Sequence, residues 1–161
     1  MLAIRTILHP TDFSAPSAYA FQMACALARD YHARLIVLHV EPPPVAALGG
    51  MLAVPPLPEE YDRENLETQL RRIQPSDPAV RVEHRLVAGD PVAEILRAAQ
   101  EQACDLIVMG TNGRTGLGRL LMGSVAEHVV RKAPCLVLTL KSPTLGQGAF
   151  PSADKKQPVQ V

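Results

Sequence analysis

The chain of 161 residues is long enough to form one domain with a well-developed core. Hydrophobic residues make up 47% of it and aromatic residues only 4%, so the core must consist mainly of aliphatic side chains, as in parallel α/β sheets. Acidic and basic side chains number 16 each, and this formal net charge of zero argues against a nucleic-acid-binding protein, which usually carries a basic excess.

Three further features predict a soluble, cytoplasmic protein. No apolar run approaches the roughly 20 residues that a membrane-spanning helix needs. The opening residues Met1–Arg5 lead into a strand pattern and lack the layout of a signal peptide. The cysteines Cys25, Cys104 and Cys135 lie in apolar patterns without metal-ligand spacing, as expected of reduced thiols in the cytosol.

The first part of the chain predicts a strand, a helix and a second strand. Thr6–His9 is a short apolar strand that Pro10 ends. Ser14–Tyr31 has helical periodicity, with Ser14 as the N-cap and a proline in the first turn. Arg34–Val40 is apolar nearly throughout, which is typical of a parallel strand that is buried on both faces.

The regular pattern is interrupted over residues 42–58, which hold six of the fifteen prolines. Such a stretch excludes a helix or an inner strand and predicts a long proline-rich loop. Helical periodicity returns over Glu59–Ile73. Val80–Ala88 then alternates between apolar and polar residues, which predicts a strand with one exposed face at an edge of the sheet.

The remaining elements continue the alternation of strands and helices. Asp90 and Pro91 form a strong helix start, and that helix is expected to run to about Ala103. It is followed by a buried strand, a helix and a final strand, at Leu106–Met109, Ser124–Lys132 and Cys135–Leu140. The pattern predicts an α/β fold, a single doubly wound five-stranded parallel sheet with helices on both faces. Residues 142–161 lose all periodicity and are interpreted as a flexible tail.

The loop between the fourth strand and the last helix holds the most informative pattern. Five glycines occur within fourteen residues, at positions 110, 113, 116, 118 and 123. Glycine allows positive φ and the close approach of a ligand, and a helix N-terminus offers free N–H groups and a partial positive charge. The loop is therefore predicted to cradle a phosphate group. Arg114 is the side chain in the loop best placed to meet phosphate oxygens, whereas Arg119 is expected to be a solvated surface charge.

Two candidate site residues also have a purely structural explanation. Ser124-Val-Ala-Glu127 fits a capping box, with the serine at the N-cap and the glutamate three residues later. Asp12, after the first strand, can bind ribose hydroxyls or a divalent cation on phosphates, or it can cap the first helix. If the first and fourth strands are neighbours, the loop Pro10–Ser14 faces the glycine-rich loop across the carboxyl edge of the sheet.

No catalytic constellation is recognised in the sequence. His9 and His39 lie near strand ends, but they belong to no ligand or triad spacing, so structural roles are expected for both. The loop also departs from the P-loop pattern of phosphate-binding enzymes.

The glycine spacing matches the signature of a known family. Gly110, two residues, Gly113, nine residues and then Gly123-Ser124 resemble the nucleotide-binding signature of the universal stress protein family. Ile7–Ser14 is similar to that family as well, and the resemblance covers residues 1–141. It implies a strand order of 3-2-1-4-5. It also implies a homodimer formed through the last strand, Cys135–Leu140, whose charge-free apolar sequence independently favours pairing with a second copy.

The resemblance further implies a ligand, because family members with the full signature bind ATP, here expected with Mg²⁺ or Mn²⁺. It places Asp12 near the ribose and the metal, and the backbone of Val40 at the adenine. The other implied ATP-binding residues are Pro10, Thr11, Met109, Gly110, Gly113, Arg114, Gly116, Gly123, Ser124 and Val125.

The expected function is therefore an ATP-binding, homodimeric regulatory module of the stress response, with slow hydrolysis at most and neither nucleic-acid nor membrane partners. One alternative is an enzyme of the adenine-nucleotide α-hydrolase type that uses ATP to activate a substrate. Another is an interaction protein with a vestigial nucleotide site, for which the apolar segment Val45–Val54 offers a docking surface.

Overall fold

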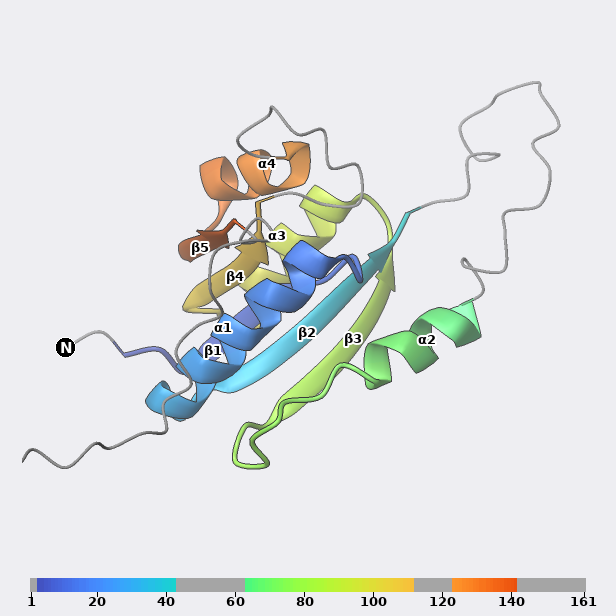
Figure 1. Cartoon of the computed structure of the whole chain (residues 1–161). Helices are drawn as coiled ribbons and strands as arrows, with labels where there is room; N and C mark the ends of the chain where they lie inside the picture. The colour runs from blue at the N-terminus through green and yellow to red at the C-terminus, as the bar shows by residue number, and fades with distance from the viewer. Residues whose placement is uncertain (1–2, 43–62, 112–122, 142–161) are drawn as a thin grey trace, which may run out of the picture.

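The computed structural model describes residues 3–42, 63–111 and 123–141, which form a three-layer α/β structure (Figure 1). Five parallel strands make one sheet in the order β3-β2-β1-β4-β5. The strands are β1 Thr6–Pro10, β2 Arg34–Glu41, β3 Val82–Ala88, β4 Leu106–Gly110 and β5 Leu136–Leu140. The helices are α1 Ala15–Tyr31, α2 Arg63–Arg71, α3 Pro91–Glu101 and α4 Ser124–Lys132. This arrangement confirms the predicted doubly wound sheet and its strand order.

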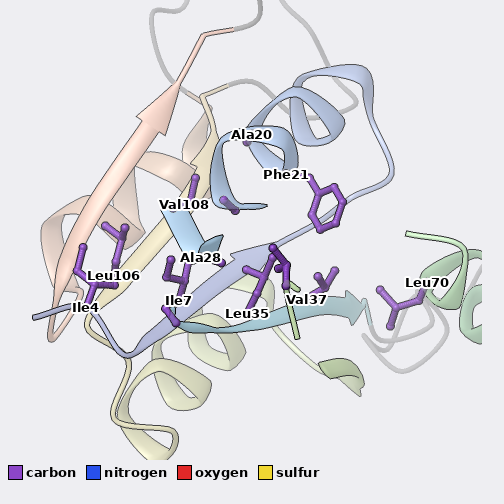
Figure 2. Close-up of a cluster of buried hydrophobic side chains, with 13 residues drawn as sticks. Ile4, Ile7, Ala20, Phe21, Ala28, Leu35, Val37, Leu70, Leu106 and Val108 are labelled. Atoms are coloured by element: carbon purple, nitrogen blue, oxygen red, sulfur yellow. The ribbon is translucent and has the colours of Figure 1, made fainter. Parts of the chain in front are cut away.

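Two apolar clusters hold the three layers together, because successive residues of a strand point to opposite faces of the sheet. On one face, side chains of β1, β2 and β4 such as Ile7, Leu35 and Val108 form one cluster with Ala20, Phe21 and Ala28 of α1 (Figure 2). On the other face, Leu8, Ile36 and Ile107 belong to the cluster that α3 and α4 cover through Ile95, Val129 and neighbouring residues. The three central strands are therefore buried on both faces.

The helix starts follow the sequence signals closely for α1 and α3. Ser14 is the N-cap of α1, and its Oγ accepts a hydrogen bond from the N–H of Ser17 at 3.3 Å. Asp90 caps α3 in the same way, accepting from the N–H of Ala93 at 2.9 Å. β3 lies at an edge of the sheet, as its alternating pattern predicts.

Several predicted segments fall wholly or partly outside the described residues. They are most of the proline-rich loop over 42–58, the beginning of the helix predicted from Glu59, and the tail over 142–161. Within the parts of the chain that are described, no helix has both the length and the apolar character needed to cross a bilayer.

A buried histidine joins β1 to β4 and α1 beneath the carboxyl edge of the sheet. His9 is completely buried, and its Nδ1–H donates to the carbonyl oxygen of Val108 at 2.8 Å. Its Nε2 is then left as an acceptor and lies 3.5 Å from Oγ of Ser17. Burial lowers the pKa of His9 to about 4, although the bond to Val108 and the charge of Asp12 act in the opposite direction. His9 is therefore neutral at pH 7.

This low pKa predicts a loss of stability in mild acid. The unfolded chain takes up a proton at His9 near the ordinary pKa of 6.5, and the folded protein does so only near pH 4. Between these values the unfolded state binds more protons, so the free energy of unfolding falls as the pH falls, by about 3 kcal/mol in total. Urea unfolding between pH 7 and pH 4 measures this slope, and the change His9→Gln is expected to flatten it.

The exposed residue His128 provides the matched control, because His128→Gln makes the same change of side chain outside the core. Equal slopes for His9→Gln and the parent protein would contradict the buried neutral state of His9.

Candidate functional site

The carboxyl edge of the sheet opens into a cavity of about 210 Å³ between the ends of β1 and β4. The two strands are hydrogen-bonded neighbours, but β1 continues into α1 on one face of the sheet and β4 leads to α4 on the other. The helices that follow the two strands therefore lie on opposite faces of the sheet, and the cavity lies between the strand ends. Ligands of open α/β sheets bind at such a point.

The cavity wall brings together nine of the twelve residues predicted to bind a ligand. They are Pro10, Thr11, Asp12, Val40, Met109, Gly110, Gly123, Ser124 and Val125. The other three, Gly113, Arg114 and Gly116, lie outside the described residues.

Six wall residues were missed by the sequence interpretation: Ser17, Leu38, Pro91, Ile95, Thr111 and Ala126. A seventh, His39, was expected near the end of its strand but only in a structural role. Pro91 and Ile95 reach the wall only because α3 packs beside α4, and no local pattern signals that contact. Thr111 directly follows Gly110, so its position beside the glycine signature is the one signal that could have pointed to it.

The β1–α1 loop holds Asp12 in place on one side of the cavity. Oδ1 of Asp12 accepts hydrogen bonds from both the N–H of Ser14, at 3.0 Å, and its hydroxyl, at 2.5 Å. Phe13 between them has a φ of 62°, in the left-handed region that a non-glycine residue occupies at a cost of about 1–3 kcal/mol. Asp12 therefore orders the residue that caps α1, and its carboxylate is fixed beside the cavity.

His39 supports the same loop from β2. Its Nδ1–H donates to the carbonyl oxygen of Thr11 at 2.7 Å, and its ring lies against that of Phe13, with the centroids 4.3 Å apart. Thr11 also accepts the N–H of Phe13 at Oγ1, at 3.2 Å. The unfavourable backbone conformation of Phe13 is thus stabilised by the hydrogen bond from its N–H to Thr11 and by the contact of its ring with His39.

On the other side of the cavity, α4 begins without a side-chain cap, so the predicted capping box is wrong. The N-cap is Gly123, and Ser124 is already the first helical residue. The N–H of Gly123 donates to the carbonyl oxygen of Thr111 at 2.6 Å, so the N-cap is held in place by a backbone bond. The helix spans the predicted range Ser124–Lys132, but its N-cap lies one residue before the predicted one. Glu127 does not reach back to the N-cap but pairs with Arg131 at 3.0 Å.

The uncapped start of α4 places backbone donors at the cavity. The carbonyl of Gly123 accepts from the N–H of Glu127, so the preceding N–H groups, of Ser124, Val125 and Ala126, have no partner within the helix. All three residues line the cavity. Together with the positive end of the helix dipole, these donors favour an anion.

Gly110 and Gly123, the two signature glycines that the structure describes, do not have positive φ angles. Gly123 has φ −70° and ψ 155°, which any residue can adopt. At Gly110 a Cβ atom would lie 3.1 Å from the carbonyl oxygen of Pro16, so glycine here lets β4 approach the first turn of α1. The expected freedom of backbone rotation therefore does not explain either position.

The remaining wall combines apolar side chains with a single negative charge. Leu38, Val40, Ile95 and Met109 supply flat apolar surface, and Asp12 is the one acidic residue among the described residues of the wall. Nowhere in the described ranges do three His, Cys, Asp or Glu side chains group as a preformed metal site. The arrangement fits a ligand that has an apolar ring at one end and an anionic group at the other.

Comparisons with known proteins identify the family of this fold. The model of the universal stress protein family matches residues 3–141. Universal stress protein MJ0531 of Methanocaldococcus jannaschii is 34% identical over 143 residues, which cover 86% of this chain and 83% of that protein. A universal stress protein of Thermus aquaticus is 36% identical over 141 residues, covering 85% of this chain and 98% of its own.

A solved universal stress protein in complex with cAMP has a similar structure, with a TM-score of 0.64 and 30% sequence identity. The match covers 86% of this chain and 97% of that one. On the strength of the family match over residues 3–141, this chain belongs to the universal stress protein family.

Proposed function

We propose that this protein binds ATP in the cavity between β1 and β4 and acts as a regulatory module of the stress response. The observation that carries the proposal is the start of α4, which has no side-chain cap and lines the same cavity as Asp12, so that its first N–H groups have no partner within the helix. The N–H groups suit the phosphates, and the carboxylate suits ribose hydroxyls. The complex of a relative with cAMP supports an adenine nucleotide as the class of ligand.

Other parts of the wall fit the remaining groups of ATP. Val40 and Met109 offer apolar contacts and backbone groups to the adenine ring. The cavity of about 210 Å³ is smaller than the roughly 300–1,000 Å³ usual for a whole ligand, so the triphosphate would extend from it along the start of α4. Mg²⁺ usually binds through one or two carboxylates together with substrate phosphates, so Asp12 alone suits a Mg²⁺ or Mn²⁺ ion that arrives with the nucleotide.

We propose slow hydrolysis at most. The hydroxyl of Ser17 and the ring of His9, 3.5 Å apart, pair a hydroxyl with an imidazole near the cavity. His9 is a poor base because burial lowers its pKa to about 4, and it is sealed in the core. This favours a binding module over an enzyme that uses ATP to activate a substrate.

Titration calorimetry with ATP and Mg²⁺ tests the ligand. The parent protein is expected to bind one ATP per chain, and Ser124→Ala to weaken binding roughly tenfold, because a hydroxyl bond to phosphate is lost. The melting temperature is expected to stay unchanged, since Ser124 caps nothing. Ser76→Ala is the matched control, because Ser76 is exposed and outside the described cavity wall. Absence of binding by the parent protein at millimolar ATP would overturn the proposal.

We also propose that two copies pair through β5, as predicted for Cys135–Leu140. β5 is hydrogen-bonded to β4 on one side and forms the edge of the described sheet on the other. Its Leu136 and Leu138 are 52% and 36% exposed. An exposed apolar edge strand without charges is prone to aggregation, and pairing with a second copy removes that hazard.

Sedimentation analysis tests this dimer. The parent protein is expected to sediment as a dimer, and Leu138→Lys as a monomer, because a lysine at the interface would lose its hydration. Tyr31→Lys serves as the control, since Tyr31 is a similarly exposed hydrophobic residue, at 43%, on α1. A monomeric parent protein, or a Leu138→Lys variant that stays dimeric, would contradict pairing through β5.

A further inference from the structure

The amino edge of the sheet carries a row of arginines, at the opposite end of the strands from the cavity between β1 and β4. Arg5 immediately precedes β1, Arg34 is the first residue of β2, and Arg81 immediately precedes β3. Because β3, β2 and β1 are neighbours in the sheet and run parallel, their starts meet at one edge. The three arginines are far apart in the chain, and only the fold brings them together.

Backbone hydrogen bonds hold these arginines side by side. The N–H of Arg34 donates to the carbonyl oxygen of Arg5 at 2.8 Å, and the N–H of Leu35 donates to the carbonyl oxygen of Arg81 at 3.1 Å. Neighbouring strands lie about 4.8 Å apart, so the three side chains start from backbone positions within about 10 Å. Like charges on adjacent strands destabilise a sheet, so this row costs stability unless a negative charge balances it.

The three arginines line a second hollow of about 600 Å³, the amino-edge cleft. Its wall also holds Arg29, near the end of α1 and paired with Asp30 at 2.9 Å, and the small buried residues Ala28 and Ala33. The volume lies within the roughly 300–1,000 Å³ usual for a small-molecule site. Among the described residues of this wall, four arginines stand against one carboxylate, that of Glu83. The amino-edge cleft is therefore positively charged and suits an anion.

The single carboxylate of the wall does not neutralise this charge. Glu83 is shared between Arg34, at 3.3 Å, and Arg85, at 2.6 Å. Within the ranges that the structure describes, the guanidinium groups of Arg5 and Arg81 have neither an ion pair nor a hydrogen bond. These two groups flank Arg34 from the neighbouring strands, and both line the amino-edge cleft. Their donors are therefore available to an anion in the cleft.

We propose that the amino-edge cleft binds a small phosphorylated molecule, at a site separate from the proposed ATP site. A guanidinium group can donate two parallel N–H bonds to phosphate oxygens. A phosphate group carries nearly two negative charges at pH 7 and has three acceptor oxygens, so one group can meet both Arg5 and Arg81. A carboxylate brings only one charge and two oxygens. A bound phosphate group also offsets the repulsion along the row of arginines.

Titration calorimetry with inorganic diphosphate tests this site, in about 0.15 M NaCl so that loosely held counter-ions are screened. The parent protein is expected to bind diphosphate, and Arg5→Gln and Arg81→Gln are each expected to weaken binding roughly tenfold, because each loses a charge-assisted contact. Arg72→Gln is the matched control, since Arg72 is an exposed arginine outside the described wall of the cleft. Citrate, an anion with carboxylates alone, is expected to bind roughly tenfold more weakly than diphosphate.

Two further measurements separate this site from a structural role and from the ATP site. Arg5 and Arg81 are joined to the sheet through backbone groups, so the melting temperature of either ligand-free variant is expected to equal or exceed that of the parent protein. Ser124→Ala, at the start of α4, is expected to leave diphosphate affinity unchanged, because it lies in the cavity at the other edge of the sheet.

Several results would overturn the proposal. They are no binding of diphosphate by the parent protein at millimolar concentration, equal affinities for the parent protein and the variants Arg5→Gln and Arg81→Gln, or equal affinities for citrate and diphosphate. A loss of diphosphate binding in Ser124→Ala alone would place the anion at α4 and overturn it too. Failure of ATP to bind would leave this site untouched, because the two sites share no residue of their described walls.

Discussion

The parallel pairing of β1 with β4 is the constraint on which the cavity depends. Ile7 pairs with Leu106, and both ends of this short ladder are clamped by side chains. At the amino end, Oδ2 of Asp105 accepts the N–H groups of Arg5 and Thr6, at 2.7 and 3.0 Å. At the carboxyl end, the ring of His9 donates to the carbonyl oxygen of Val108. The two strands are neighbours in the sheet but far apart in sequence. These polar contacts therefore hold together the two strands between which the strand order of the sheet reverses.

The carboxyl-end clamp also shapes the floor of the cavity. His9 contacts Ser17, whose hydroxyl bonds to that of Thr11 at 2.9 Å, and both of these residues line the cavity. The floor is therefore continuous with the core, and burial keeps His9 neutral at pH 7. A charged imidazolium at this position would lack the water that stabilises it, so the same burial that makes the floor rigid makes it sensitive to acid.

Much of this arrangement follows from local sequence, and the parts that do not are tertiary. The apolar run Arg34–Val40 and the caps Ser14 and Asp90 predict their elements because the signals lie within a few residues. The capping box at Ser124 fails because the start of α4 is set by a bond from Gly123 to a residue twelve positions earlier. The sequence did not predict Thr111 as a cavity residue for the same reason, because its place in the wall depends on tertiary contacts with β5 and α4.

The cavity wall contains polar groups that have no side-chain partner among the described residues. α1 and α3 bond their first N–H groups to Ser14 and Asp90, whereas α4 begins at a glycine without a side-chain bond. A missing cap costs about 1 kcal/mol, and a buried unsatisfied hydroxyl such as that of Thr111 about 1–3 kcal/mol. A ligand whose anionic group meets the N–H groups at the start of α4 binds the folded state alone, and at a hundred times its dissociation constant it adds about 2.7 kcal/mol to the stability. If the proposed nucleotide site is occupied in this way, the ligand stabilises the folded state as a whole, the start of α4 included.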